Sequence, residues 1–348
     1  MIQAETIKQL QQDLDETFRE AESQRKSLRR SQAICHGAGA LYVFFIIYLV
    51  FSSMIGFLDH NSPWKDIHIV VFMIPLFILL FGSNVYFKVS YIGFSELEKK
   101  SVRDIMERLF PKVACTIDDI PISKSTVINS KFFPRLENEG SLTKAFGSIS
   151  FPGLEVYDLA IFEAVKKNVV TTSTVFSYIM LIQGLLQQAI SPRFDSALYT
   201  FRGLYACAVL PKKTKKLKGI VIILPDKLEA HLDYLAETVQ SMTTIDGCKL
   251  VKLEDPEFER HFKVYATDEV QARYVLTPLM MQQMSSLRAK YDRDVMFSFC
   301  EDEFHFAVSM PEGLLTLGDK VITDRNNIRI IYDNVCAAQS ILKELRLK

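Results

Sequence analysis

The stretch AGALYVFFIIYLVFSSMIGFL, from Ala38 to Leu58, has 21 residues and no charged side chain. A second uncharged stretch of 19 residues, IVVFMIPLFILLFGSNVYF, runs from Ile69 to Phe87. At about 1.5 Å of rise per residue, a helix of either length crosses a hydrocarbon core of about 30 Å. A buried helix of a soluble protein can be equally apolar when it occurs alone. Two such runs, separated only by residues 59–68, favour a transmembrane hairpin instead.

The sequence around the hairpin indicates its orientation. A cleaved signal peptide is excluded, because six acidic side chains precede the first stretch and no small-residue cleavage pattern follows it. The flanks are basic, with Arg25, Lys26, Arg29, Arg30, Lys88, Lys99, Lys100 and Arg103. The connection at 59–68 contains Lys65 as its only Lys or Arg. By the positive-inside rule, both ends of this two-span protein are expected in the cytoplasm.

Composition indicates that the rest of the chain is folded. The sequence has 348 residues, with 41 basic and 41 acidic side chains, and 49% of its residues are apolar. The balanced charge argues against a dedicated nucleic-acid-binding protein, which needs a basic face to neutralise phosphates. The apolar content is too high for a disordered chain.

The chain divides into four parts: an N-terminal cytoplasmic helix (1–37), the hairpin (38–87), a juxtamembrane helix (88–110) and a cytoplasmic domain (111–348). Strand and helix patterns intermix in the last part without a βαβ rhythm, which predicts an α+β fold. Strands are expected at 198–210, 219–224, 262–266, 295–300 and 304–309, with the last two forming a hairpin. Helices are expected at 228–242, at 268–290 with a break before Pro278, and at 327–345.

Residues 168–192 also carry no charge, so a third membrane span has to be considered. Threonine, serine and glutamine side chains within the segment make its transfer into lipid unfavourable. A buried segment, or an amphipathic one lying against the membrane, is the preferred interpretation.

The residue types that carry out chemistry are not grouped along the chain. There is no G-x-x-x-x-G-K-[ST], G-x-S-x-G or H-E-x-x-H motif. The cysteines are widely spaced, at Cys35, Cys115, Cys207, Cys248, Cys300 and Cys336. None has a cysteine or histidine at metal-ligand spacing, so reduced thiols are expected. His305, within FHFAVS, is expected on a strand face. The sequence therefore predicts no catalytic residue, no metal site and no cofactor.

The segment FERHFKVYATDEVQARYVLTPLMMQQMSSL, from Phe258 to Leu287, closely resembles the signature of a bacterial family of unknown function, domain-of-unknown-function family 3137. Further resemblance lies at 130–140, 156–167 and 201–219, and in the closing helix RIIYDNVCAAQSILKELRL. The resemblance implies a cytoplasmic domain anchored in the bacterial inner membrane. Family members are often encoded near LemA-type membrane proteins, which makes such a protein a candidate partner.

Within this signature, a strand followed by two short helices accounts for most of the residues. Asp268 is placed to cap the first helix, Arg273 to bond the carbonyls at its end, and Thr277 to cap the second helix. A binding site built from Thr267, Asp268 and Arg273 is the alternative.

The densest run of charge consists of Lys212, Lys213, Lys215, Lys216 and Lys218. Near an anionic bilayer each lysine could contribute about 1 kcal/mol of attraction, so this loop is a candidate membrane-surface contact. The simpler alternative is a hairpin loop that is basic only for solubility.

The function that these features favour is an adaptor, scaffold or sensor. Its cytoplasmic domain would bind another protein, a second copy of the chain or the bilayer surface. The competing hypothesis is a membrane-bound hydrolase or transferase whose site is assembled from dispersed residues near Asp268 and Arg273.

Overall fold

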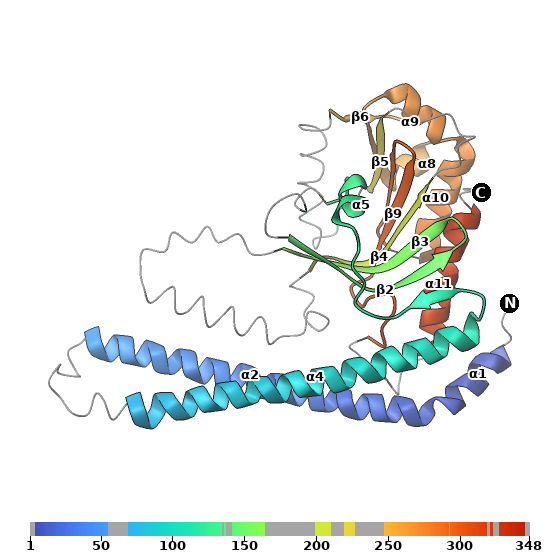
Figure 1. The fold of residues 1–348 in the computed structure, drawn as a ribbon. Coiled ribbons are helices and arrows are strands. Elements are labelled where there is room, and N and C mark those ends of the chain that lie inside the picture. The colour runs from blue at the N-terminus through green and yellow to red at the C-terminus, as the bar shows by residue number, and fades with distance from the viewer. Residues whose placement is uncertain are drawn as a thin grey trace.

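The fold is a helical hairpin joined to an antiparallel sheet, as a computed structural model of the chain shows (Figure 1). The structure describes residues 4–54, 69–133, 136, 141–163, 199–209, 219–226, 247–291, 293–318, 321–322 and 327–344. Within them, the prediction of an α+β body after a helical hairpin is confirmed.

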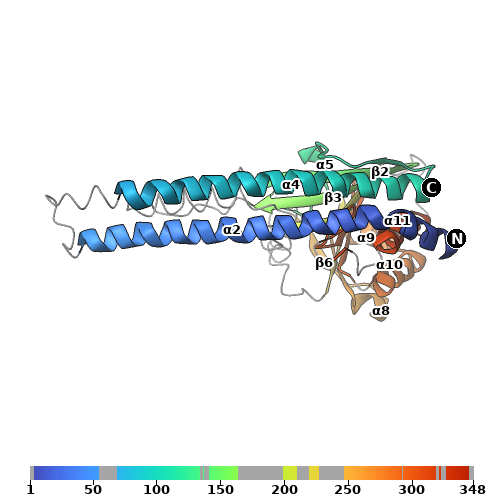
Figure 2. The ribbon, with the colours of Figure 1, turned by 90° about the horizontal axis from the view of Figure 1, so that it is seen from below.

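The N-terminal region consists of helices α1 (Ala4–Asp13), α2 (Asp15–Met54) and α4 (Ile74–Leu109), with a π-helical turn, η1 (Ile69–Met73), leading into α4. Helices α2 and α4 lie antiparallel and side by side in both views (Figures 1 and 2). At one end Arg108 pairs with Asp13 at 3.0 Å, and toward the other end the ring centroids of Phe45 and Phe72 lie 6.0 Å apart. Helix α4 ends just before Pro111, as expected.

The hairpin has two halves of different character. We call residues 38–54 and 69–87 the apolar half, and residues 15–37 and 88–109 the charged half. The apolar half contains no Asp, Glu, Lys or Arg. Leu80 and Phe87 are buried, but many of the large side chains in this half point outward, and several are more than half exposed: Phe44, Phe51, Phe77, Ile78 and Phe81. The described strands lie over the charged half, and the apolar half extends beyond them (Figures 1 and 2).

All nine described strands form one sheet in the order β1-β2-β3-β4-β9-β8-β5-β7-β6, and every neighbouring pair is antiparallel. The strands are β1 (Ala114–Thr116), β2 (Ser141–Phe151), β3 (Leu154–Glu163), β4 (Tyr199–Val209), β5 (Ile220–Pro225), β6 (Lys249–Val251), β7 (Phe262–Ala266), β8 (Val295–Cys300) and β9 (Glu303–Ser309). Strands β4, β5, β7, β8 and β9 confirm the predicted segments, and β8 pairs with β9 as the predicted hairpin.

The remaining described helices are α5 (Lys124–Asn129), α8 (Pro256–Glu259), α9 (Glu269–Val275), α10 (Pro278–Tyr291) and α11 (Asn327–Glu344). The break before Pro278 and the closing helix are therefore confirmed. The predicted helix at 228–242 and the uncharged segment at 168–192 lie outside the described residues.

The charged half of the hairpin is part of the fold of the body. One hydrophobic core contains Leu28 of α2, Phe94 and Ile105 of α4, and residues on one face of the sheet such as Val156 and Phe306. A second core lies on the opposite face, where α5 and the segment after it contribute Val127, Phe132, Phe133 and Leu136. The sheet is thus covered on one face by elements that include the two long helices.

Candidate functional site

Three buried carboxylates converge on the loop that follows β9. We call residues Gly313–Gly318, together with Val321 and Ile322, the strap. Its backbone N–H groups donate to Glu22 of α2, Glu98 of α4 and Asp158 of β3. The strap is therefore bonded to both long helices and to the sheet.

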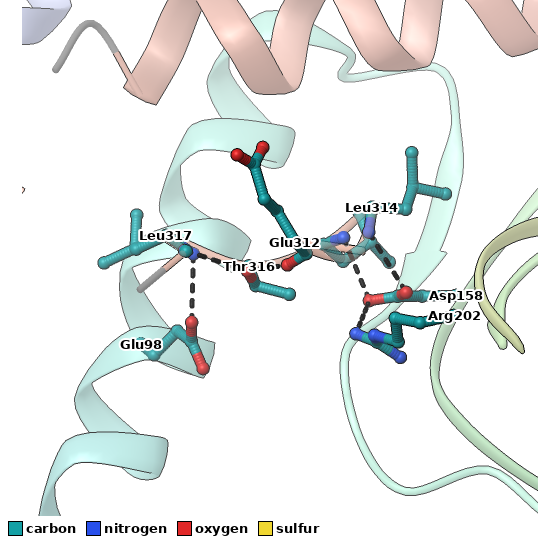
Figure 3. Close-up of polar contacts among 9 residues, drawn as sticks. Glu98, Asp158, Arg202, Glu312, Leu314, Thr316 and Leu317 are labelled. Carbon is teal, nitrogen blue, oxygen red and sulfur yellow. Dashed lines mark hydrogen bonds and ion pairs between the residues drawn. The ribbon is translucent and has the colours of Figure 1, made fainter. Parts of the chain in front are cut away.

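Asp158 makes the most extensive of these contacts. Its two carboxylate oxygens accept the N–H groups of Leu314 and Leu315, each at 3.0 Å (Figure 3). The Arg202 guanidinium donates to the same carboxylate at 3.0 Å, and both side chains are buried. Arg202 also lies over the Phe146 ring, 4.3 Å from its centroid. The two strap amides bond both oxygens of the Asp158 carboxylate, which offsets part of the free-energy cost of burying its charge.

Glu98 holds the next turn of the strap. Its Oε1 accepts the N–H of Leu317 at 2.9 Å (Figure 3), and the side chain is 2% exposed. Thr316 closes the turn internally, because its hydroxyl donates to the Glu312 carbonyl and accepts the N–H of Gly318, both at 2.9 Å.

Glu22 holds the far end of the strap. One oxygen accepts the N–H of Ile322 at 2.9 Å, and the carboxylate also pairs with Arg25 one turn along α2 at 2.7 and 2.8 Å. The hydrogen bond from Arg25 is the main cause that lowers the pKa of Glu22, with a further contribution from the Ile322 amide. This carboxyl is therefore ionised at neutral pH although its side chain is nearly buried.

Gly313 begins the strap in a conformation that favours glycine. Its φ is 86°, in the left-handed region, and a Cβ at this position would clash with the Arg202 guanidinium. The close approach of the strap to the Asp158–Arg202 pair thus depends on the absence of a side chain here.

The opposite side of the strap lines a polar cavity of about 240 Å³ against α11. Backbone and side-chain groups of Gly313, Thr316 and Leu317 form one wall, and Asn327 and Asp333 contribute to the other. Any change in the strap would therefore alter this cavity.

The three residues predicted as a binding site at the β7–α9 corner hold local structure. Asp268 caps α9 by accepting the N–H of Val270 at 2.8 Å, as predicted. Thr267 accepts the N–H of Ile220 at 3.0 Å and so extends the pairing of β5 with β7. Arg273 does not bond the carbonyls at the end of α9, because its side chain reaches outward instead. It donates to Glu254 and Glu269, and to the carbonyl of Lys252.

A groove of about 460 Å³ lies beside this corner. Arg273 contributes to its lining together with Glu254, Leu276 and Met281, whereas Thr267 and Asp268 do not. The structure therefore does not bring the three predicted residues to one cavity. The lysine loop, with Lys212, Lys213, Lys215, Lys216 and Lys218, lies outside the described residues, so its contact with lipid stays a prediction.

A second polar cluster lies on the face of the sheet opposite the long helices. The Tyr205 hydroxyl donates to the Thr126 carbonyl at 2.9 Å and lies 3.0 Å from Nδ1 of His305. Whether the hydroxyl or Nδ1 donates in the second contact depends on the tautomer of His305. Burial lowers the pKa of His305 to about 4, although the Glu303 carboxylate, 3.2 Å from Nε2, opposes this shift.

The cysteines near these sites are poor nucleophiles. Burial raises the pKa of Cys207 to about 11 and that of Cys115 to about 12, so both thiols are protonated at neutral pH. Cys207 lies directly opposite His305 in the β4–β9 pairing, but neither group is ionised.

The sequence model of a family described as a protein of unknown function, DUF3137, matches residues 199–347. This segment is a DUF3137 domain. No curated protein and no solved structure matches the chain. The predicted resemblance at 258–287, at 201–219 and in the closing helix falls inside the matched residues, and the segments at 130–140 and 156–167 fall outside them.

The DUF3137 domain provides β4 to β9, the strap and α11, whereas β1, β2 and β3 extend its sheet from an earlier part of the chain. All three carboxylates that hold the strap also lie before residue 199. The strap therefore hydrogen-bonds the DUF3137 domain to the hairpin, and it adds to the bonds that the β3–β4 pairing already makes with β3.

Sequence reasoning did not identify the strap. Glu98 lies four residues after the buried Phe94, and Glu22 four residues after the buried Phe18, so each acidic side chain occupies the buried face of a helix. Asp158 similarly interrupts the apolar run VYDLAIF. These three positions could have indicated a buried polar contact, because a carboxylate on a buried face requires hydrogen-bond partners.

Proposed function

We propose that this protein is a membrane-anchored interaction module. Its hairpin spans the bacterial inner membrane, and its α+β body, which includes the DUF3137 domain, acts in the cytoplasm as an adaptor, scaffold or sensor. The two helices long and apolar enough to cross a membrane support the anchor.

The distribution of exposed apolar side chains carries the proposal. Large apolar side chains cover the outside of the apolar half, whereas the charged half buries most of its apolar side chains in the core of the body and exposes Ile34, Val89 and Ile92. Transfer of one such side chain from water to an apolar medium is worth about 1.5–3 kcal/mol. A bilayer around the apolar half would supply that medium for all of them.

The proposed orientation rests on the basic flanks. Arg25 is taken up by its buried pair with Glu22, so it adds little to the surface charge. Lys26 is mostly exposed, and Lys88, Lys100 and Arg103 also lie beyond the apolar half. These cations would lie at the cytoplasmic surface, which favours cytoplasmic termini.

Reporter fusions test this topology. Alkaline phosphatase inserted within residues 59–68 should be active, and green fluorescent protein fused after Lys348 should fluoresce. The protein should also remain in the membrane fraction after carbonate washing and leave it in mild detergent. An active phosphatase at the C-terminus, or release by carbonate, would contradict the two-span anchor.

For the partner we propose a LemA-type membrane protein or a second copy of the chain, on the basis of the family resemblance. Affinity purification of the tagged protein from mild-detergent membranes, followed by native mass measurement, tests both. A stoichiometric partner or a defined homo-oligomer is the expected result, and a lone monomer would contradict an assembly role.

The hydrolase or transferase hypothesis has no specific observation in its favour among the described residues. At the β7–α9 corner, Thr267 and Asp268 accept backbone N–H groups, and Arg273 is held by exposed ion pairs. We therefore do not extend the proposal to catalysis.

A further inference from the structure

We propose that the strap couples the hairpin to the DUF3137 domain, so that α2, α4 and the β3–β4 region of the sheet change position together. The inference deepens the proposed function, because it states how a movement of the membrane anchor would reach the cytoplasmic domain. The inference rests on the proposed function only because that function places the hairpin in a membrane.

Three separate elements, α2, α4 and β3, hold one short segment of the chain. Glu22, Glu98 and Asp158 are far apart in sequence, yet all of them accept N–H groups from residues between Leu314 and Ile322. The donors belong to the backbone, and at most seven residues separate any two of them along the chain. A displacement of one donor is therefore passed to the next through covalent geometry.

Breaking any one of these hydrogen bonds costs free energy, because both partners are buried. All three carboxylates are buried, at 4% exposure or less, and so are the amides of Leu314, Leu315 and Leu317. A buried donor or charged acceptor that loses its partner is strongly unfavourable, because water does not replace the lost bond. A shift of α4 relative to the sheet must therefore either carry the strap with it or open the strap as a whole.

Lys99 and Arg103 of α4 also pair with Asp118, but the Asp118 carboxylate is largely exposed, so water can replace these ion pairs when the elements move. The charged half and the sheet meet mainly through apolar side chains, which tolerate sliding more easily than directional bonds do. The strap supplies directional bonds to both sides. It also lines the cavity against α11, so a movement of the hairpin would be expressed in the shape of that cavity.

Hydrogen–deuterium exchange of the full-length protein in detergent micelles tests the coupling. Glu98→Leu removes the acceptor for Leu317, and Glu98→Gln weakens it while keeping the shape of the side chain. We expect exchange at Leu314 and Leu315, whose N–H groups bond Asp158, to become about fivefold faster in Glu98→Gln and faster still in Glu98→Leu. Glu96→Gln is the matched control, because Glu96 lies on the exposed side of the same helix and should leave these amides unchanged.

The reciprocal experiment starts from the domain side, since coupling acts equally in both directions. Gly313→Ala, at the Arg202 end of the strap, should accelerate exchange at Leu317 and Ile322. If this variant fails to fold, the comparison of Glu98→Gln with Glu96→Gln alone tests the coupling.

Faster exchange confined to Leu317 in both Glu98 variants, with Leu314 and Leu315 within about twofold of the parent protein, would overturn the proposal. Carbonate extraction of the same variants separates this failure from a failure of the anchor. A protein that is released by carbonate but shows coupled exchange would refute the anchor and leave the coupling intact.

Discussion

At His305, burial determines the charge of the ring. Nδ1 lies 3.0 Å from the Tyr205 hydroxyl and Nε2 lies 3.2 Å from a Glu303 carboxylate oxygen, and burial lowers the pKa of His305 to about 4. Burial also raises the pKa of Tyr205, which keeps its hydroxyl protonated as this arrangement requires. The cluster is therefore neutral at His305 in the folded state.

This neutrality predicts a pH dependence of stability. The folded pKa of about 4 lies below the usual value of 6.5, so the unfolded chain binds a proton between these values and the folded protein does not. The contribution of His305 to the free energy of unfolding is fully present above pH 6.5 and is lost as the pH decreases toward 4. The loss from this group is about 3 kcal/mol, at 1.36 kcal/mol per pH unit. Urea unfolding of the detergent-solubilised protein at pH 7, 5.5 and 4.5 measures it.

His305→Asn should remove this component of the pH dependence, although it also lowers stability at neutral pH. His261→Asn is the control, because the described hydrogen bonds at His261 use its backbone: the N–H donates to Phe258, and the carbonyl accepts from Asp226 and Arg288. If His305→Asn and the parent protein lose the same stability between pH 7 and 4.5, the neutral, buried state of His305 is incorrect.

At the scale of secondary structure, the spacing of apolar residues is sufficient to predict an element wherever one pattern dominates. Alternation in FKVYA and VMFSFC located β7 and β8 to the residue, and the Thr-Pro pair located the start of α10. Strands β2 and β3 were not predicted. Their sequences mix small, polar and charged residues, and a register shift between Ala145 and Ser148 interrupts the alternation of β2.

The strap could not be predicted as an element, because its structure depends on partners far away in the sequence. A loop such as EGLLTLG shows turn residues at Gly313 and Gly318, but nothing in it specifies three carboxylates contributed by α2, α4 and β3. The corner at Asp268, by contrast, depends on residues within a few positions of one another, and its cap was predicted correctly.

The cap makes a quantitative prediction at this scale. Asp268→Ala removes the acceptor for Val270 and should destabilise the protein by about 1 kcal/mol. Arg273→Ala should destabilise the protein less than Asp268→Ala does, because the ion pairs of Arg273 are exposed. Urea unfolding of the two variants at pH 7 measures both effects. A larger effect from Arg273 than from Asp268 would show that the corner depends on the cation rather than on the cap.

For the whole molecule, the shared core predicts where the protein can be divided. Residues 111–348 alone would lose Leu28, Phe94 and Ile105 from the core, together with Glu22 and Glu98 from the strap. The uncovered apolar surface and the unpaired strap amides should make this fragment aggregate. A boundary drawn at the end of α4 would therefore cut through the folded unit.

A deletion within the hairpin should preserve the folded unit. Removing residues 38–87 and joining residues 37 and 88 through a short Gly-Ser linker keeps the charged half, the strap contacts and the sheet. The Ser27 hydroxyl of α2 lies 3.5 Å from the Tyr86 hydroxyl of α4, so the two helices are close enough at this level for such a linker. We expect a soluble protein with cooperative unfolding and exchange protection at Leu314, Leu315 and Leu317. Measuring the solubility and the amide exchange of the 111–348 fragment and of the linked chain tests both expectations. If the 111–348 fragment is soluble and protected while the linked chain aggregates, the charged half is not part of the fold, and a membrane anchor attached through α4 alone would describe the molecule better.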